Sequence, residues 1–177
     1  MTAPKRSDSA SAAVRMGGMI PALRIPEPIH RKMVEQCRAE APLEACGILA
    51  GPLNANEAAE ASLVTMIYPL RNAERSPTRF SADTRDLLEA HKAMRARGET
   101  IRAIYHSHPR WEPIPSATDL ARNAHGAIPW VIVSLLSEPP PVRVWRLSAS
   151  SYEELFWELV TVAPEGWGTV DRAERAS

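Results

Sequence analysis

Cysteine is scarce in this chain of 177 residues, which contains only Cys37 and Cys46. Two cysteines cannot form a disulfide framework or a four-cysteine zinc site, and such sparse use is typical of a reducing compartment. Stability must then come from an apolar core. The chain is long enough to build one, because a domain of about 150 residues buries roughly 70% of the surface of its extended chain.

Net charge is also absent, since 21 lysines and arginines balance 21 aspartates and glutamates. A protein that binds nucleic acid usually carries a basic excess or a basic stripe. The body of this chain shows neither feature. We therefore expect no nucleic-acid partner.

Long apolar runs are missing as well. The N-terminal segment has charged residues but no continuous apolar stretch of the about 7–15 residues found in a signal peptide. No window approaches the roughly 18 apolar residues that span a membrane. We therefore expect a cytoplasmic protein without a membrane partner.

Helix and strand patterns alternate along the middle of the chain. Apolar residues recur at helical spacing from Ile29 to Cys37, and Pro42 ends that pattern. Asp83 and Gly98 mark the start and the end of a second helix. The pattern predicts a third helix at 116–125 and strands at 44–51, 62–68, 101–108, 129–136, 142–148 and 152–162. Glutamates in the last segment leave a helix possible there. This order predicts an α/β (α+β) fold with a single mixed β-sheet flanked by helices.

The two ends of the chain differ in composition from this patterned region. Residues 1–19 are rich in serine, alanine and glycine and show no periodicity, so we expect a disordered N-terminal tail. Residues 164–177 are largely polar and are expected to form a flexible C-terminal tail. One domain is expected over residues 20–163.

The stretch HSHPRWEPIPSATD, residues 106–119, contains the side chains most suited to chemistry. His106 and His108 stand one residue apart at the end of an apolar run, so both lie on the same side of the expected strand. Neutral imidazole is the commonest metal ligand, and two histidines on one edge can share one ion. The alternative is a pair of histidines with ordinary hydrogen bonds.

Ser116 and Asp119 follow a turn that Pro113 and Pro115 stiffen. A Ser-x-x-acid sequence before a helix is a variant of the capping box, and it places the hydroxyl and the carboxylate near one end of that helix. Two histidines and one carboxylate leave the fourth position of a tetrahedral zinc site open, which is the pattern of a catalytic site. Capping and metal binding are compatible, so both interpretations stay open.

The same residues resemble the signature of the JAMM (MPN+) zinc metallopeptidases, in which His-x-His is followed after seven residues by Ser-x-x-Asp. Seven residues, 109–115, separate His108 from Ser116 here. The phrases PLEACGILAG and NAERSPTRF also resemble stretches of compact bacterial members of this family. The resemblance covers about residues 23–162 and implies a JAMM fold similar to that of cytidine deaminases.

This resemblance implies a role for each residue of the motif. His106, His108 and Asp119 become the ligands of one Zn²⁺ ion per chain. Glu44 becomes the general base and Ser116 the oxyanion stabiliser. By sequence alone, Glu44 is one glutamate among many, at the mouth of an apolar strand where burial could raise its pKa. The alternative is a solvated acid at a strand edge.

The resemblance also implies a class of substrate. Members of the family cut after the C-terminal Gly-Gly of ubiquitin or of small β-grasp relatives. Compact bacterial members are associated with sulfur carriers, which implies a ubiquitin-like β-grasp sulfur-carrier protein as the partner, joined by an amide to cysteine or to a protein. Eukaryotic members that cleave ubiquitin chains carry extra insertions, for which 177 residues leave little room.

Three other classes compete with this interpretation. Non-catalytic scaffold members of the family have lost the motif, whereas all five motif positions are intact here. An amidohydrolase with His-x-His on a barrel strand needs about 250 residues, so the length of this chain disfavours it. A related group tied to DNA repair shares a similar stretch, but the zero net charge and the lack of a DNA-binding module argue against it.

Several other reactive side chains have structural explanations. Cys46 lies inside an apolar strand, which favours a small buried hydrophobe over a thiol nucleophile. His91 continues an apolar helical stripe and is expected to be packed. Glu112 is expected to be solvated in its turn. Trp111 either contacts a substrate protein or covers the loop beside the motif.

Overall fold

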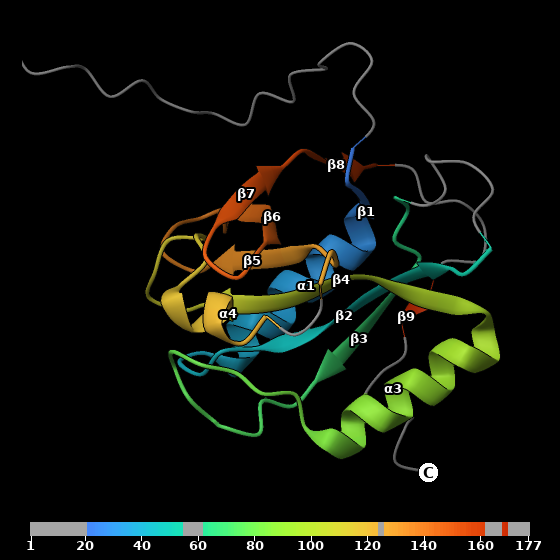
Figure 1. The fold of residues 1–177 in the computed structure, drawn as a ribbon, viewed down its shortest axis with the longest axis horizontal. Coiled ribbons are helices and arrows are strands. Elements are labelled where there is room, and N and C mark those ends of the chain that lie inside the picture. Colours follow the sequence, from blue (N-terminus) through green and yellow to red (C-terminus); the bar gives the residue numbers. More distant parts are fainter. Residues whose placement is uncertain (1–20, 55–61, 124–125, 162–167, 170–177) are drawn as a thin grey trace, which may run out of the picture.

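Figure 1 shows the computed structural model, which describes residues 21–54, 62–123, 126–161 and 168–169. Seven strands form one sheet in the order β7-β6-β5-β4-β2-β3-β9. They are β2 (Cys46–Pro52), β3 (Met66–Leu70), β4 (Glu99–His108), β5 (Trp130–Ser134), β6 (Val142–Leu147), β7 (Tyr152–Leu155) and β9 (Gly168–Thr169). The sheet is mixed, because β4–β5 and β3–β9 are parallel and the other neighbouring pairs are antiparallel.

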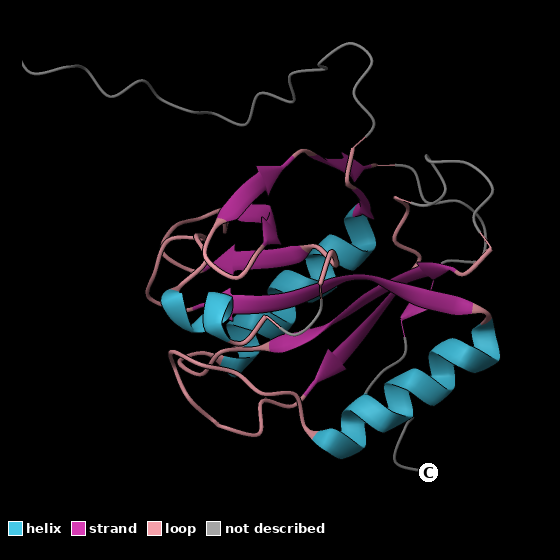
Figure 2. Ribbon diagram, viewed as in Figure 1, coloured by secondary structure: helices cyan, strands magenta, loops and turns pink. Residues whose placement is uncertain are grey.

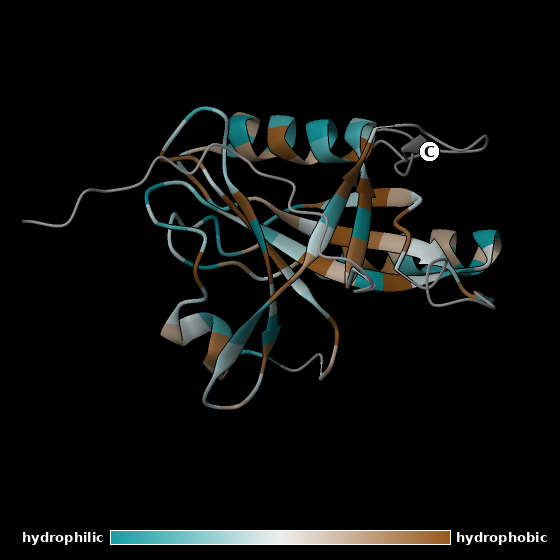
Figure 3. Ribbon diagram, turned by 90° about the horizontal axis from the view of Figure 1, so that it is seen from above, coloured by the Kyte–Doolittle hydropathy of each residue, from teal (hydrophilic) through white to brown (hydrophobic). Residues whose placement is uncertain are grey.

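Two long helices, α1 (Glu27–Glu40) and α3 (Thr84–Arg97), pack on opposite faces of this sheet. Alternate residues of a strand face opposite sides. On β2, Ile48 and Ala50 join the core formed with α3, whereas Leu49 joins the core formed with α1. Helix α1 lies behind the central strands in Figure 2, and Figure 3 shows helices that alternate apolar and polar residues along their length. The expected α/β class, with a mixed sheet flanked by helices, is confirmed.

Both long helices begin and end at the residues that local signals predict. Pro28 lies in the first turn of α1, where a missing N–H costs little, and the helix ends before Pro42. Asp83 caps α3 by accepting two backbone N–H groups of its first turn. Gly98 ends α3 with a left-handed φ of 66°, which favours glycine.

Local patterns do not predict the second, two-stranded sheet. In it, β1 (Leu23–Pro26) pairs in parallel with β8 (Trp157–Val160). The segment 152–162 therefore forms two strands in different sheets, β7 and β8, so the expectation of one strand or a helix was wrong. The strands separate at Phe156, whose carbonyl accepts the Ala22 N–H at 2.8 Å. Partners so far apart in the chain leave no mark on local periodicity.

Two element boundaries also differ from the prediction. The third helix, α4 (Ala117–Ala121), ends before residue 125, because the Arg122 N–H bonds back to the carbonyls of Thr118 and Leu120 and closes the last turn. Strand β3 begins at Met66 instead of residue 62, since residues 62–64 pair with Arg24 of β1: Arg24 donates its N–H to the carbonyl of Ser62, and Val64 donates its N–H to the carbonyl of Arg24.

Most of the two expected tails lies outside the described residues. The structure describes nothing of residues 1–19, and within 164–177 it describes only β9, which pairs with β3. The domain boundaries therefore stay a prediction. None of the helices in the described ranges combines the length and the apolar character that crossing a bilayer requires.

Candidate metal centre

The two histidines of the motif end strand β4, in the middle of the sheet. Because β4 is flanked by β2 and β5, both imidazoles are buried, with 0% exposure for His106 and 4% for His108. Their side chains lie on the same face, as strand alternation predicts. The Nε2 atoms are 3.1 Å apart.

Asp119 comes from the first turn of α4, and Ser116 is the N-cap of that helix. The Ser116 N–H and hydroxyl both donate to Oδ2 of Asp119 at 2.7 Å, and the Asp119 N–H donates to the Ser116 hydroxyl at 3.2 Å. The predicted capping box is therefore present. It fixes the Asp119 carboxylate on the histidine side of the helix.

Two hydrogen bonds hold the proline-rich turn that carries α4 back to the sheet. The Trp145 indole N–H donates to the carbonyl of Pro113 at 2.8 Å, and the Ser134 hydroxyl donates to the carbonyl of Trp111 at 2.6 Å. Both donors lie on neighbouring strands of the sheet. The position of α4 relative to β4 is thus set by the strands beside β4.

The three motif side chains converge to a spacing that suits zinc. Oδ1 of Asp119 lies 3.5 Å from Nε2 of His106, and Oδ2 lies 3.7 Å from Nε2 of His108. One ligand atom from each residue lies within 4.8 Å of the others. A tetrahedral zinc site with bonds of about 2.0–2.1 Å has edges of about 3.3 Å between ligand atoms. The sequence prediction that these residues meet at one point agrees with this geometry.

The hydrogen bonds of His108 prepare it for metal binding. Its Nδ1 lies 2.7 Å from the backbone carbonyl of Glu112, which can only accept a proton. Nδ1 is therefore the donor, and the lone pair of Nε2 points toward His106 and Asp119. Histidine ligands of metals commonly have such a carbonyl partner on the other ring nitrogen. Glu112 thus contributes its backbone, which the sequence could not indicate.

Burial and hydrogen-bonding partners together shift the pKa values of the donor set. Burial lowers the pKa of His106 to about 4, although the nearby Asp119 opposes this, so the ring is neutral at pH 7. Burial would raise the pKa of Asp119, but contacts with His108, His106 and Ser116 outweigh it and hold the pKa below its usual range. For His108, the carboxylate of Asp119 and the carbonyl of Glu112 outweigh burial and raise the pKa.

Glu44 lies beside this donor set, at the entry to β2. Glu44 is only 3% exposed, so it is not a solvated acid at a strand edge. Ala45 and Ser107 exchange hydrogen bonds, which extends the Cys46–His106 pairing by one residue and brings Glu44 opposite His108. Burial raises the pKa of Glu44 to about 7, with His108 opposing and the Asp119 charge adding to the rise.

The loop 71–83 contributes contacts that sequence reasoning missed. The Phe80 ring of this loop stacks on His106 with centroids 4.7 Å apart and planes at 23°. From β5, the Trp130 ring packs edge-on against the same His106 ring, with centroids 5.7 Å apart. In the sequence, the loop is a polar, turn-rich segment without periodicity, and nothing in it marks Phe80 as a neighbour of a histidine.

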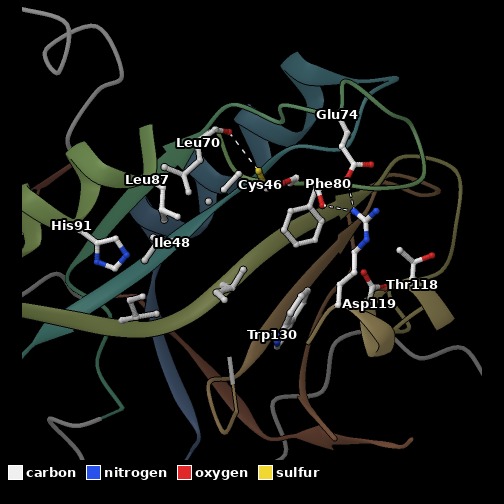
Figure 4. Close-up of a pocket in the computed structure, with 16 residues that line it drawn as sticks. Cys46, Ile48, Leu70, Glu74, Phe80, Leu87, His91, Thr118, Asp119 and Trp130 are labelled. Carbon is white, nitrogen blue, oxygen red and sulfur yellow. Dashed lines mark hydrogen bonds and ion pairs between the residues drawn. The ribbon is translucent and has the colours of Figure 1, made fainter. Parts of the chain in front are cut away.

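An apolar pocket of about 570 Å³ opens beside the donor set on the α3 face of the sheet. In Figure 4, Phe80 and Trp130 lie in its middle, Asp119 marks one end and His91 of α3 marks the other. His91 is exposed at that outer end, so the expectation that it is packed was wrong, because α3 turns this side chain toward the pocket opening. Cys46 is buried in the pocket wall, as expected.

Residues 26–148 match the family described as prokaryotic homologs of the JAB domain. This chain belongs to that family. The prediction of a JAMM (MPN+) relative is confirmed, and the match contains Glu44 and the whole His-x-His…Ser-x-x-Asp stretch.

Relatives of this JAB-domain protein include proteins named as peptidases or proteases. The CysO-cysteine peptidase of Mycobacterium tuberculosis is 36% identical over 117 residues, which cover 66% of this chain and 76% of that protein. A probable TtuB-protein conjugate cleaving protease of Thermus thermophilus is 37% identical over 109 residues, covering 59% of this chain and 67% of that one. A solution structure from Desulfitobacterium hafniense superposes with a TM-score of 0.73 at 28% identity, covering 81% of this chain and 97% of the other.

Proposed function

We propose that this JAB-domain protein is a zinc-dependent peptidase or isopeptidase. Its substrate is the amide bond after the C-terminal Gly-Gly of a ubiquitin-like β-grasp sulfur-carrier protein, joined to cysteine or to another protein. The observation that carries the proposal is the convergence of His106, His108 and Asp119, together with a buried carboxylate, Glu44, whose charge interacts with His108 and Asp119. The relatives named as a CysO-cysteine peptidase and a probable TtuB-protein conjugate cleaving protease support the substrate class.

The donor set suits one Zn²⁺ ion, with His106, His108 and Asp119 as ligands. When bound there, zinc supplies Lewis acidity, which lowers the pKa of water and polarises a carbonyl group. Neutral imidazoles and an ionised carboxylate are the forms that bind metal, and burial and the partners of Asp119 favour those forms for His106 and Asp119.

Glu44 acts as the proton carrier in this proposal. It accepts a proton from the attacking water as the oxygen bonds to the Gly carbonyl carbon, and it passes that proton to the leaving amine as the C–N bond breaks. The products are a carrier carboxylate and a free amine. Burial raises the pKa of Glu44 in the metal-free protein, which suits both transfers, because an effective acid–base group has a pKa close to the working pH.

Ser116 is proposed to donate its hydroxyl to the oxyanion, a contact that in other enzymes contributes roughly 3 kcal/mol. In the structure the hydroxyl donates to Asp119, so it must turn away from that carboxylate when the substrate binds. The apolar pocket beside Asp119 offers a surface for the segment of carrier next to the scissile bond. A cytoplasmic setting stays a prediction.

The test uses a carrier protein whose Gly-Gly terminus is joined to cysteine by an amide, with the mass of the products as the readout. We expect cleavage by zinc-loaded protein, and none by chelated protein or by Glu44→Gln. Glu44→Gln should retain one zinc per chain and His106→Ala should lose it, because a base is not a ligand. Full activity after chelation, or in Glu44→Gln, would contradict the proposal.

One competing function follows from the same site. A protein that binds one zinc per chain and cleaves neither carrier adducts nor carrier–protein conjugates would be a non-catalytic zinc-binding scaffold. The buried Glu44 argues against it, because a scaffold has no use for a carboxylate whose burial raises its pKa beside a donor set.

A further inference from the structure

The backbone at Glu44 is held by four hydrogen bonds on two sides. On the strand side, the Ala45 N–H donates to the Ser107 hydroxyl at 2.8 Å, and the Ser107 N–H donates to the Ala45 carbonyl at 3.0 Å. On the loop side, the Glu44 N–H donates to the Ser76 carbonyl at 2.9 Å, and the Glu44 carbonyl accepts from the Asn72 amide at 3.0 Å. Every backbone polar group of Glu44 and Ala45 thus has a partner.

Asn72 is the side chain that organises the loop side. Its Nδ2 donates to the carbonyls of Glu44 and Arg79 at 3.0 and 2.9 Å. Its Oδ1 accepts the N–H groups of Glu74 and Ser81 at 3.1 and 3.2 Å. A side-chain amide has two N–H donors and two acceptor sites, so its whole capacity is used.

Burial makes this arrangement rigid. Asn72 is 7% exposed, and leaving a polar group unpaired at such a site costs free energy. Moving the loop would break these hydrogen bonds, so the loop is held in one position. Serine offers one O–H donor instead of two N–H donors, and an ionised aspartate offers no donor. Asparagine is therefore the small side chain that can close loop 71–83 and hold the Glu44 carbonyl at the same time.

We propose that Asn72 is a positioning residue for the base: it holds the Glu44 backbone, and through it the carboxylate, at its place beside the metal centre. This rests on the proposed role of Glu44. Within the part of the chain that the structure describes, Asn72 contacts Glu44 through the main-chain carbonyl and forms no hydrogen bond with His106, His108 or Asp119. Its loss should therefore slow proton transfer, while the three ligand side chains remain able to bind one zinc per chain.

The test compares Asn72→Asp and Asn72→Ala with the unmodified protein. Aspartate keeps the size and one acceptor oxygen but loses both donors, and alanine removes the amide without adding charge. A displacement of about 1 Å at a reacting group can cost about 100-fold in rate. We expect kcat to fall about 10- to 100-fold in both variants, with KM within about twofold and one zinc retained per chain.

The matched control is Asn123→Asp. Asn123 also donates its side-chain amide to a backbone carbonyl, that of Leu147 at 3.2 Å, but away from Glu44. This variant should keep its kcat. Zinc content and circular dichroism identify any variant that has failed to fold, and Asn72→Ala is the milder change if Asn72→Asp does so, because aspartate would face two carbonyl oxygens with a buried carboxylate.

A second measurement separates positioning from general damage. The substrate is a carrier with a C-terminal aminomethylcoumarin amide, whose activated leaving group keeps the residual rate of Glu44→Gln measurable. If Asn72 acts through Glu44, then Asn72→Asp should cause no further loss of kcat in the Glu44→Gln background. An equal loss in both backgrounds, or an unchanged kcat in folded Asn72 variants, would overturn the inference.

The outcome also distinguishes this inference from the proposed function. If Glu44→Gln keeps the activity of the unmodified protein, the proposed role of Glu44 has failed, and the inference fails with it. If Glu44→Gln has a much lower kcat and Asn72→Asp lowers that residual kcat as much as it lowers the kcat of the unmodified protein, only the positioning role is rejected.

Discussion

At the scale of single residues, burial acts in opposite directions on neighbouring groups of the metal centre. It lowers the pKa of His106 to about 4 and raises that of Glu44 to about 7, since in both cases it disfavours the charged form. Asp119 escapes this trend because its histidine and serine partners outweigh burial. A neutral ligand, an anionic ligand and a titratable carboxylate therefore coexist within one site.

Replacing Ser116 by alanine separates its two proposed roles. Loss of the N-cap should cost about 1 kcal/mol of the free energy of unfolding, because Asp119 N–H loses its acceptor. Loss of the oxyanion donor should also lower kcat by about two orders of magnitude. Urea unfolding and steady-state kinetics measure the two effects. As a control, Asp83→Ala removes the N-cap of α3 and should lower the stability without changing kcat. An unchanged kcat in Ser116→Ala would exclude Ser116 from the mechanism.

The raised pKa of Glu44 predicts a pH-dependent stability of the metal-free protein. The folded state binds the Glu44 proton more tightly than the unfolded chain, so protonation stabilises the fold. This contribution is complete below pH 4.5 and is lost as the pH rises through about 7. A shift from 4.5 to about 7 corresponds to at most about 3 kcal/mol.

Comparison with Glu44→Gln isolates that contribution. In urea unfolding with a chelator present, the variant should gain stability relative to the unmodified protein between pH 5 and pH 8.5. Glutamine cannot ionise, whereas the buried glutamate becomes charged over this range. A stability difference that stays constant with pH would mean that Glu44 is solvated in the folded protein.

At the scale of elements, α4 is too short to be stable alone, because helices shorter than about 12 residues are marginal in water. Its five residues, Ala117–Ala121, are held by the capping box, by the pinned turn before it and by Arg122 after it. Arg122 forms an ion pair with Glu74 and donates to the Phe80 carbonyl at 3.3 Å. The helix that carries Asp119 is thereby tied to the loop whose Phe80 ring stacks on His106.

Arg122→Gln should loosen this tie more than it destabilises the protein. Exposed ion pairs contribute at most about 1 kcal/mol to stability. Removal of a group that orients metal ligands commonly costs about 10-fold or more in metal affinity. We expect the free energy of unfolding to change by less than about 1 kcal/mol. The zinc dissociation constant, measured with a competing chelator, should rise about 10-fold.

Arg146→Gln is the matched control for that prediction. Arg146 forms a similarly exposed ion pair with Glu153 at 2.8 Å, between β6 and β7 and away from loop 71–83. It should lose as little stability as Arg122→Gln and keep its zinc affinity. Equal zinc affinities in the two variants would show that Arg122 does not support the metal centre.

At the scale of the whole molecule, the donor set lies where three separate segments meet. The end of β4 supplies the histidines, α4 supplies the carboxylate, and the entry to β2 supplies Glu44. The pocket beside them is framed by the sheet, by loop 71–83 and by α3. Trp111, which is 58% exposed in the turn before α4, does not cover the loop but faces solvent, where a partner protein can reach it.

Substrate selectivity is the prediction that belongs to this scale. The apolar pocket beside Asp119 offers a surface for the segment next to the scissile bond, so recognition should depend on the carrier body and its Gly-Gly tail. We expect a higher kcat/KM on a carrier–cysteine or carrier–peptide amide than on lysine-linked diubiquitin of any linkage. The two substrates are compared side by side with zinc-loaded protein. A preference for diubiquitin would overturn the carrier assignment and leave the zinc chemistry standing.

The sequence by itself determined the features that depend on neighbours along the chain. Pro42 and Gly98 end helices through their own backbone geometry. His106 and His108 share a face because a strand alternates, and Ser116 caps α4 because its hydroxyl reaches an N–H three residues ahead. The spacing of the motif, seven residues between His108 and Ser116, is likewise a property of the sequence alone.

Only the tertiary structure decided which distant segments meet. The pairing of β1 with β8 divides a segment that looks continuous in the sequence. Glu44 is buried because the segments around Ser107 and Asn72 close over its backbone. A carboxylate in a sequence has no burial of its own, since desolvation depends on every segment packed around it, and local periodicity contains no record of those segments.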